Sequence, residues 1–417
     1  MKKFLIKGGK KLVGTVEVSG AKNAILPILA ACLLTRGKSV LTNVPRLVDL
    51  KTMAHLLRVI GARIEYFDGS LEVDTSDVCF PEAPYELVSQ MRASIYVLGP
   101  LLVKFKKAKV SFPGGCAIGA RPIDLHLTAL EQMGAKFETK KGYLYATTDE
   151  LKGAEINFSN VSVGATCHIL MTATLAKGKT IMRNCAKEPE IDSLIDFLVK
   201  MGAKIKGKST STLEIDGVKE LFPVGMEMMP DRIEAGTFLI AGAITNSEIT
   251  VSNCYPEHLG ALILKLQQAG FKIDVTENSM TIFPIDKILP VDIVTAPYPS
   301  FPTDLQAQFL TLMTLAQGIS HVEDTIFPDR FMHVPELNRL QANITQEKGK
   351  ARIEGVKELS GAEVMATDLR ASAALVLAGL AAEGETIVSR IYHIDRGYDN
   401  IEGKLTKLGA NIARIEE

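Results

Sequence analysis

A short pattern of apolar and polar positions recurs along the whole chain. In each copy a leucine stands four positions before a residue that ends a helix, and a brief apolar strand start follows. The copies are LRVIGARI from Leu57, LEQMGAKF from Leu130, LVKMGAKI from Leu198, LQQAGFKI from Leu266, LNRLQANI from Leu337 and LTKLGANI from Leu405. Their leucines are 68–73 residues apart, so the 417 residues hold six units of about 70 residues.

The recurring pattern predicts an amphipathic helix that ends in the left-handed backbone region. Glycine enters that region without a steric penalty, and five of the six copies have one there: Gly61, Gly134, Gly202, Gly270 and Gly409. Gln341 takes the place of the sixth glycine. These helices keep a polar face, so we expect them on the outside of the fold.

Each unit also contains a helix that is apolar on all sides, which predicts burial. The six stretches are AILPILAACLL, ASIYVLGPLLV, ATCHILMTATLA, TFLIAGAIT, LQAQFLTLMTLA and ASAALVLAGLAA. With strands between the helices, the fold class is α/β, and six central helices fit two barrels of three better than one barrel. We therefore predict one domain over residues 22–229, and a second formed by residues 1–21 and 230–417. The first twenty residues are typical of two strands around a Gly-Gly turn.

Composition narrows the class of protein. A formal charge of -1 offers no global basic field for nucleic acid or for an anionic membrane. The apolar runs at residues 24–34 and 371–382 are too short to span a bilayer, and the N-terminus lacks a signal-peptide core, so we expect a cytoplasmic protein. Six scattered cysteines without a Cys-x-x-Cys motif indicate thiols in a reducing compartment.

The sequence contains no motif that is typical of a bound metal, a nucleoside triphosphate or a dinucleotide cofactor. The seven histidines show no metal-ligand spacing, and neither a P-loop nor a Gly-x-Gly-x-x-Gly motif occurs. We therefore expect no metal and no cofactor. Nucleotide triphosphate hydrolysis and hydride transfer are disfavoured for the same reason.

Charged residues recur at one place in the repeat, the start of the buried helix. When the six repeats are aligned at this point, the residues that coincide are Lys22, Arg92, Gly164, Glu234, Asp304 and Arg370. If the central helices of one domain run parallel, their N-termini gather at one end with free N–H groups and positive dipole ends. That end is predicted to bind anions.

Three more arginines precede the amphipathic helices: Arg121, Arg330 and Arg396. A guanidinium holds a carboxylate or phosphate through two parallel hydrogen bonds, so converging arginines indicate a small, highly charged anionic substrate. The alternative is that each arginine pairs with an adjacent acid, as Arg396 could with Asp395.

Two further side chains are candidates for proton transfer. Cys116 lies in the glycine-rich segment PGGCAIGAR beside Arg121, where positive charge would lower the pKa of its thiol. The alternative is that this glycine-rich loop is a turn without a catalytic function. Asp304 begins a buried helix among basic groups, a position that suits a helix cap and equally a general base. The other five cysteines give no functional signal.

Six segments carry a resemblance to a known family: SGAKNA at Ser19, MRAS at Met91, PGGCAIGARPIDLH at Pro113, FPTDLQAQ at Phe301, MATDLRAS at Met365 and YHIDRGYDNIE at Tyr392. Together they resemble the UDP-N-acetylglucosamine 1-carboxyvinyltransferases, or UDP-N-acetylglucosamine enolpyruvyl transferases, over essentially the whole chain. The resemblance implies two inside-out α/β barrels of three units each, a fold similar to 5-enolpyruvylshikimate-3-phosphate synthase. It also implies transfer of the enolpyruvyl group of phosphoenolpyruvate to the 3-hydroxyl of UDP-N-acetylglucosamine, the first committed step of peptidoglycan biosynthesis.

The resemblance also implies roles for individual residues. Phosphoenolpyruvate would be bound by Lys22, Asn23, Arg121, Arg330, Arg370 and Arg396. UDP-N-acetylglucosamine would be bound by Arg92, Arg121, Pro122, Ile123, Asp124, Leu125, Asp304 and Ile326. Cys116 would be the general acid and the site of a covalent adduct, including one with fosfomycin, on a loop that serves as a lid. Asp304 would accept the 3-hydroxyl proton, and Lys22 and Arg396 would act in catalysis. Asn160 stands where many members have a lysine near the diphosphate.

Two rival readings remain open. The shikimate-pathway synthase shares the fold and the donor but lacks the cysteine-bearing loop, and a paralogue could bind the nucleotide sugar without turnover. Small-molecule substrates are the expected partners. No protein partner or oligomeric state follows from the sequence.

Overall fold

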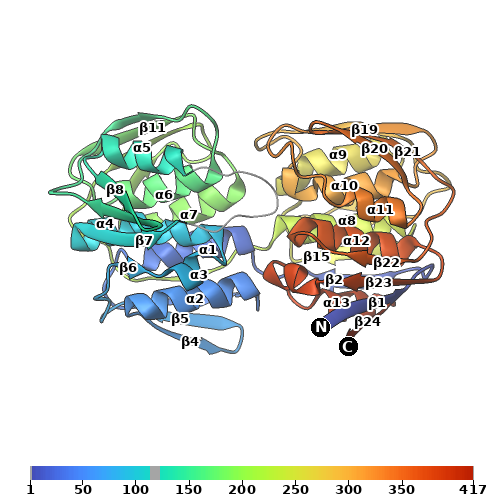
Figure 1. Cartoon of the computed structure of the whole chain (residues 1–417), viewed down its shortest axis with the longest axis horizontal. Coiled ribbons are helices and arrows are strands. Elements are labelled where there is room, and N and C mark those ends of the chain that lie inside the picture. Colours follow the sequence, from blue (N-terminus) through green and yellow to red (C-terminus); the bar gives the residue numbers. More distant parts are fainter. Residues whose placement is uncertain (1, 113–122, 417) are drawn as a thin grey trace. The chain divides into compact units, whose positions relative to one another are not determined.

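The computed structural model describes residues 2–112 and 123–416. The described chain divides into two compact units (Figure 1). The first unit comprises residues 20–112 and 123–229, and the second comprises residues 2–19 and 230–416. Each unit has its own hydrophobic core.

The first unit alternates helices and strands. In chain order its elements are α1 (Lys22–Cys32), β3 (Lys38–Thr42), α2 (Val48–Ile60), β4 (Arg63–Phe67), β5 (Ser70–Asp74), β6 (Glu82–Ala83), α3 (Tyr85–Val88), η1 (Arg92–Val97), α4 (Leu98–Phe105), β7 (Lys107–Ser111), α5 (Asp124–Gln132), β8 (Lys136–Lys140), β9 (Tyr143–Thr147), β10 (Glu155–Asn157), α6 (Val163–Ala173), β11 (Lys179–Arg183), α7 (Pro189–Lys200), β12 (Lys204–Lys206), β13 (Thr212–Asp216) and β14 (Gly225–Glu227).

The second unit repeats this alternation after two N-terminal strands. Its elements are β1 (Lys2–Lys7), β2 (Val13–Glu17), α8 (Arg232–Ile244), β15 (Glu248–Ser252), η2 (Pro256–Leu259), α9 (Gly260–Gln268), β16 (Ile273–Val275), β17 (Ser279–Ile282), β18 (Ile293–Thr295), η3 (Thr303–Leu305), α10 (Gln306–Met313), β19 (Ile319–Asp324), α11 (Val334–Arg339), β20 (Asn343–Glu347), β21 (Lys350–Glu354), β22 (Glu363–Met365), α12 (Leu369–Ala381), β23 (Glu385–Ser389), η4 (Ile391–Arg396), α13 (Ile401–Lys407) and β24 (Asn411–Glu416).

The described residues form six four-stranded sheets, three in each compact unit. All six have the same strand arrangement, which reflects the sequence repeat. In the sheet β10-β11-β13-β12, for example, the first pair is parallel and the other two pairs are antiparallel. The predicted α/β fold built from six repeats of about 70 residues is therefore confirmed. The two N-terminal strands complete sheets of the second unit, since β1 pairs with β23 and β24, and β2 pairs with β15.

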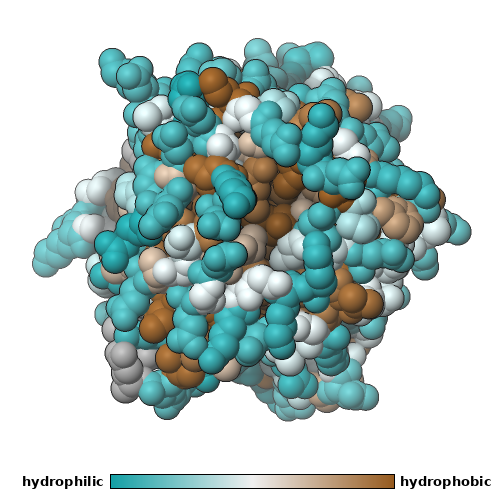
Figure 2. Space-filling model, turned by 90° about the vertical axis from the view of Figure 1, so that its right-hand side faces the viewer, coloured by the Kyte–Doolittle hydropathy of each residue, from teal (hydrophilic) through white to brown (hydrophobic). Residues whose placement is uncertain are grey.

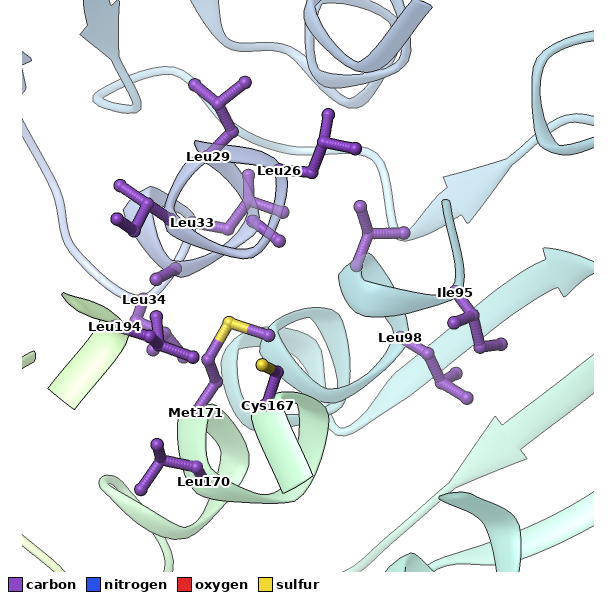
Figure 3. Packing of buried hydrophobic residues seen from close by; sticks show 14 of the residues in the cluster. Leu26, Leu29, Leu33, Leu34, Ile95, Leu98, Cys167, Leu170, Met171 and Leu194 are labelled. Carbon is purple, nitrogen blue, oxygen red and sulfur yellow. The ribbon is translucent and has the colours of Figure 1, made fainter. Parts of the chain in front are cut away.

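The apolar helices lie inside each unit, as their sequences predict. In the first unit α1, α4 and α6 pack together, and in the second α8, α10 and α12 do. Figure 3 shows Leu26 and Leu29 of α1 in the same core as Cys167, Leu170 and Met171 of α6. Two of these segments begin as 3-10 helices, η1 and η3, rather than as the continuous helices that the apolar pattern suggests.

Polar residues dominate the outer surface. One face of the second unit is mainly hydrophilic, with some hydrophobic residues showing between the polar ones (Figure 2). Within the described part of the chain, no helix combines the length and the apolar character needed to cross a membrane.

The outer helices end as the sequence predicts. All five glycines have positive φ angles, between 97° and 111°. Gln341 adopts the same region, with φ of 65°, although its Cβ makes that conformation costly. The position in the repeat, and not the residue present, therefore fixes this backbone conformation.

Exchanging the residue types at this position should change stability in opposite directions. Gln341→Gly should raise the free energy of unfolding by about 0.5 kcal/mol, because it removes the Cβ penalty but adds backbone entropy to the unfolded chain. Gly409→Ala should lower it by about 1 kcal/mol. Denaturant titration of both variants checks this, and a Gln341→Gly variant as destabilised as Gly409→Ala would refute it.

Candidate active site

Asp304 of the second unit lies between two arginines. One carboxylate oxygen, Oδ1, is 2.8 Å from Nη1 of Arg330, and the other, Oδ2, is 2.8 Å from Nη2 of Arg370. The three residues come from η3, from the segment after β19 and from α12, so the tertiary fold brings them together. Both arginine side chains are almost fully buried, whereas the side chain of Asp304 is 26% exposed.

The arginines determine the charge state of Asp304. Burial alone would raise its pKa, but the charges and hydrogen bonds of Arg370 and Arg330 outweigh burial and hold the pKa well below its ordinary value. The alternative that Asp304 only caps a helix is wrong, because Pro302 occupies the capping position of η3. Asp231 and Asp368 cap α8 and α12 instead.

Arg370 is held in place by the N-terminus of α12. Its backbone N–H donates to the capping carboxylate of Asp368 at 2.8 Å, and its Nη1 donates to the hydroxyl of Tyr398 at 3.2 Å. Tyr398 is buried and shares hydrogen bonds with Thr237 and Gln308. The guanidinium therefore has little freedom to rotate.

Each arginine nevertheless has a buried donor that no described residue satisfies. The Nε–H groups of Arg330 and Arg370 are buried, and neither has a hydrogen-bond partner within residues 2–112 and 123–416. A buried, unsatisfied N–H of a charged group is costly, so an anion that reached these donors would be stabilised. This is the feature expected of a site that holds a carboxylate or phosphate.

Arg396 and Ile326 also belong to the second unit. Arg396 ends η4, which packs against α12, and its charge contributes to lowering the pKa of the partly buried His393, after the larger effect of burial. The adjacent Asp395 places its two oxygens on Arg414, at 2.7 and 2.8 Å. The acid next to Arg396 in the sequence is therefore bound by Arg414. Ile326 lies in the segment after β19 and is partly exposed.

In the first unit the charged helix starts also gather. Lys22 opens α1, and its Nζ is 2.9 Å from Oδ2 of the buried Asp49 on α2. Asn23 follows it in α1, and Arg92 opens η1, which packs against both α1 and α6. Gly164, in the second position of α6, takes the place of a charged residue in the repeat.

Two buried histidines order the surroundings of Arg92. The backbone N–H of Gly99 donates to Nε2 of His168 at 2.8 Å, so the neutral ring carries its proton on Nδ1, which is 3.0 Å from Nδ1 of His126. His126 is thereby left with its proton on Nε2. Burial, followed by the charge of Arg92, lowers the pKa of His126 to about 4, so the ring is neutral at neutral pH.

The histidine pair fixes the start of α5, where three candidate residues stand in sequence: Ile123, Asp124 and Leu125. Asp124 opens the helix, and its charge raises the pKa of His126, against the larger lowering effects of burial and of Arg92. A Cβ at Gly164 would lie 3.4 Å from Nε2 of His126, so the glycine admits the ring closely.

Three of the predicted site residues, Cys116, Arg121 and Pro122, lie outside the described residues. Among the described cysteines, burial raises the pKa values of Cys32, Cys167, Cys185 and Cys254, so these four thiols are not activated. Cys79 is exposed. No group of three metal-ligating side chains lies together in the described ranges.

Glu234 shares the repeat position of Lys22 and Arg370 but has a structural role. Its Oε1 is 2.6 Å from Nζ of Lys404, and its Oε2 accepts from the backbone N–H of Ser19 at 2.7 Å. Repeat position alone therefore does not assign a residue to the site.

Sequence reasoning missed several partners of the site residues. Asp49 and His168 lie outside the quoted motifs, whereas Tyr398 and His126 stand within YHIDRGYDNIE and PGGCAIGARPIDLH but carry no assigned role there. A buried polar residue on an otherwise apolar helix face, such as His168 in ATCHILMTATLA, was the one available signal.

Comparison with known proteins places this geometry in a family. A family profile described as EPSP synthase (3-phosphoshikimate 1-carboxyvinyltransferase) matches residues 6–405. Proteins named UDP-N-acetylglucosamine 1-carboxyvinyltransferase are similar over the full length: that of Geotalea uraniireducens is 55% identical with all of both chains covered, and that of Bdellovibrio bacteriovorus is 54% identical over 99% of this chain and 100% of its own. The chain belongs to the UDP-N-acetylglucosamine 1-carboxyvinyltransferase family.

Solved structures agree with this placement. The enolpyruvyl transferase NikO from Streptomyces tendae superposes with a TM-score of 0.90 at 25% identity, over 99% of this chain and 98% of that one. EPSP synthase from Acinetobacter baumannii has a TM-score of 0.77 at 17% identity over both whole chains, which shows a shared fold. The predicted enolpyruvyl transferase fold is confirmed.

Removing the carboxylate charge at Asp304 should destabilise the protein strongly. Asp304→Asn leaves two buried guanidinium groups without their counter-ion, and we expect a loss of about 3 kcal/mol at pH 7. Because the folded-state pKa of Asp304 is depressed, its contribution is complete above the unfolded pKa of about 4 and is lost as the pH falls through the folded value. The difference between wild type and variant should therefore shrink only below about pH 4.

Denaturant titrations from pH 3 to pH 8 provide the measurement. Asp274→Asn is the matched control, because Asp274 forms an exposed ion pair with Lys272 in the same unit and should matter little. Equal effects of the two substitutions would show that the Asp304 cluster does not stabilise the fold.

Proposed function

We propose that this protein transfers the enolpyruvyl group of phosphoenolpyruvate to the 3-hydroxyl of UDP-N-acetylglucosamine, with release of inorganic phosphate. The observation that carries the proposal is the buried Asp304–Arg330–Arg370 cluster with its two unsatisfied Nε–H groups, in a chain of this family. Such a cluster suits a small substrate with several negative charges.

The donor is assigned to the cationic residues. Its carboxylate would be held by Arg330 and Arg370, whose free Nε–H donors fit a planar anion. Lys22 and Asn23 would contact phosphoenolpyruvate, and Arg121 and Arg396 would help to hold its phosphate. These interactions position the reacting carbon, which supplies much of the rate enhancement in such reactions.

Proton transfers are assigned to Cys116 and Asp304. The Cys116 thiol would protonate the methylene carbon of phosphoenolpyruvate, leaving positive charge at C2. The sugar oxygen then attacks C2 as Asp304 takes its proton, which gives a tetrahedral intermediate. Loss of phosphate and of a proton from the methyl group restores the double bond. Cys116 could instead attack C2 to give a covalent adduct, and we propose it as the site of attack for epoxides such as fosfomycin.

Donor binding would prepare Asp304 for its role as base. In the ligand-free protein the two arginines hold its pKa so low that it would accept a proton poorly. A substrate carboxylate beside the same guanidinium groups competes for their charge and hydrogen bonds. The pKa of Asp304 should then rise toward a value that suits a general base.

The acceptor is assigned to residues around the histidine pair and the β19 loop. Arg92, Arg121, Pro122, Ile123, Asp124 and Leu125 would contact UDP-N-acetylglucosamine in the first unit. In the second unit Asp304 and Ile326 would contact it. Asn160 is exposed and precedes the cap of α6, so the lysine contact of other members would be replaced by a neutral amide.

The reaction would serve peptidoglycan synthesis, and through it cell wall biogenesis, cell shape and cell division. We propose the cytoplasm as its location and expect no metal or cofactor. The rival activity is enolpyruvyl transfer to shikimate 3-phosphate, which the family profile's description names. Relatives above 50% identity over the whole chain favour the nucleotide sugar.

Phosphate release with the two acceptors tests the function. With phosphoenolpyruvate present, we expect release with UDP-N-acetylglucosamine and none with shikimate 3-phosphate. Cys116→Ser should reduce turnover by at least about 100-fold, because loss of a general acid costs that much. Cys79→Ser is the matched control and should retain full turnover, since Cys79 is an exposed thiol outside the assigned site.

The opposite acceptor preference would replace this function with the shikimate activity. Binding of UDP-N-acetylglucosamine without phosphate release would indicate a non-catalytic paralogue. Full activity of the Cys116→Ser variant would remove the thiol from the mechanism.

A further inference from the structure

The carboxylate of Asp324 is a buried junction of the second unit that no sequence motif singled out. Asp324 ends β19 and is 1% exposed. Oδ1 accepts hydrogen bonds from Thr295 Oγ1 at 2.8 Å, from the N–H of Ile326 at 3.0 Å and from the N–H of Phe327 at 2.8 Å. Oδ2 accepts from Thr303 Oγ1 at 2.6 Å. Four donors therefore converge on one side chain.

The bond to Thr303 has a direction. A carboxylate only accepts hydrogen bonds, so the single hydroxyl proton of Thr303 points at Asp324. The lone pairs of the Thr303 oxygen are then available to accept, and Nη1 of Arg330 donates to this oxygen at 3.1 Å. Asp324 thus makes Thr303 an acceptor toward Arg330.

This contact completes the orientation of Arg330. Its Nη1 carries two hydrogens, one directed at Thr303 and the other at Asp304 Oδ1, 2.8 Å away. A planar group held through two bonds from one nitrogen has a fixed plane. Its Nε–H, which has no partner in the described ranges, consequently keeps one direction for a ligand.

The other oxygen of Asp324 acts on the backbone. The N–H groups of Ile326 and Phe327 both donate to Oδ1, which folds the chain after β19 into a tight turn. Ile326 is the residue of this loop assigned to the acceptor. One buried carboxylate is therefore connected to Arg330, which is assigned to the donor, and to Ile326, which is assigned to the acceptor.

We propose that Asp324 is a positioning residue that orients Arg330 through Thr303 and the Ile326 loop through its backbone N–H groups. This inference rests on the proposed function, because Arg330 and Ile326 are assigned to substrates there. Asp324 touches neither substrate. The plain alternative is a structural turn residue whose hydroxyl partners are interchangeable.

Variants of two threonines, Thr303 and Thr295, distinguish the positioning role from the purely structural one. Thr303 and Thr295 each donate one hydroxyl hydrogen bond to Asp324, but only Thr303 also contacts Arg330. Thr303→Val should lower kcat/KM for phosphoenolpyruvate by about ten-fold and leave KM for UDP-N-acetylglucosamine within about two-fold, since it misaligns one charged hydrogen-bond donor. Thr303→Ser, which keeps the hydroxyl, should retain the kcat/KM of the unsubstituted protein for phosphoenolpyruvate. Thr295→Val should leave both parameters within about two-fold, although it removes a hydroxyl that also donates to Asp324 and that accepts from the backbone N–H of Thr325.

Crystal structures of the two ligand-free valine variants give a readout that does not depend on activity. The Arg330 guanidinium should change its plane in Thr303→Val and keep it in Thr295→Val. Equal kinetic losses in both variants, or an unchanged Arg330 with unchanged kcat/KM in Thr303→Val, would overturn the proposal. If the unsubstituted protein releases no phosphate, the proposed function fails, and the orientation of Arg330 still decides the positioning role.

Discussion

The charge of Asp304 between two buried arginines is the interaction on which the rest of the site depends. Guanidinium groups are expensive to bury unless a counter-ion and hydrogen bonds compensate them, and Asp304 supplies both to Arg330 and Arg370. The same pairing depresses the pKa of the carboxyl group. A ligand that brings its own carboxylate can take over this role, so the ligand-free arrangement is stable and ready for exchange.

The repeated fold explains why these charges meet. Each repeat of about 70 residues buries an apolar helix, and the buried helices of one compact unit pack against one another, so residues at the same repeat position can meet, as Asp304 and Arg370 do. The six positions have in fact diverged, into cations, one glycine and two acids, and Glu234 stabilises the fold while Asp304 and Arg370 form the site.

Local patterns predicted local features well. Helix ends at Gly61 and Gly409 and the buried helices follow from periodicity and from the conformational freedom of glycine, whereas the left-handed backbone at Gln341 does not follow from its residue type. Pairings between distant segments did not follow. Asp304 and Arg370 are 66 residues apart, and nothing in their spacing distinguishes an ion pair from a helix cap. Asp49 and Asp324 were missed for the same reason, since each is a single acid on an ordinary element whose partners come from elsewhere in the chain.

The titration of Asp304 tests the central claim most directly. Protein labelled with ¹³C at the aspartate carboxyl carbons, with Asp304→Asn to assign the signal, allows NMR measurement of this one pKa. The account predicts a pKa well below the ordinary aspartate value in the ligand-free protein and a clear rise when phosphoenolpyruvate saturates the site. An ordinary pKa without ligand, or a depressed pKa that phosphoenolpyruvate leaves unchanged, would contradict it.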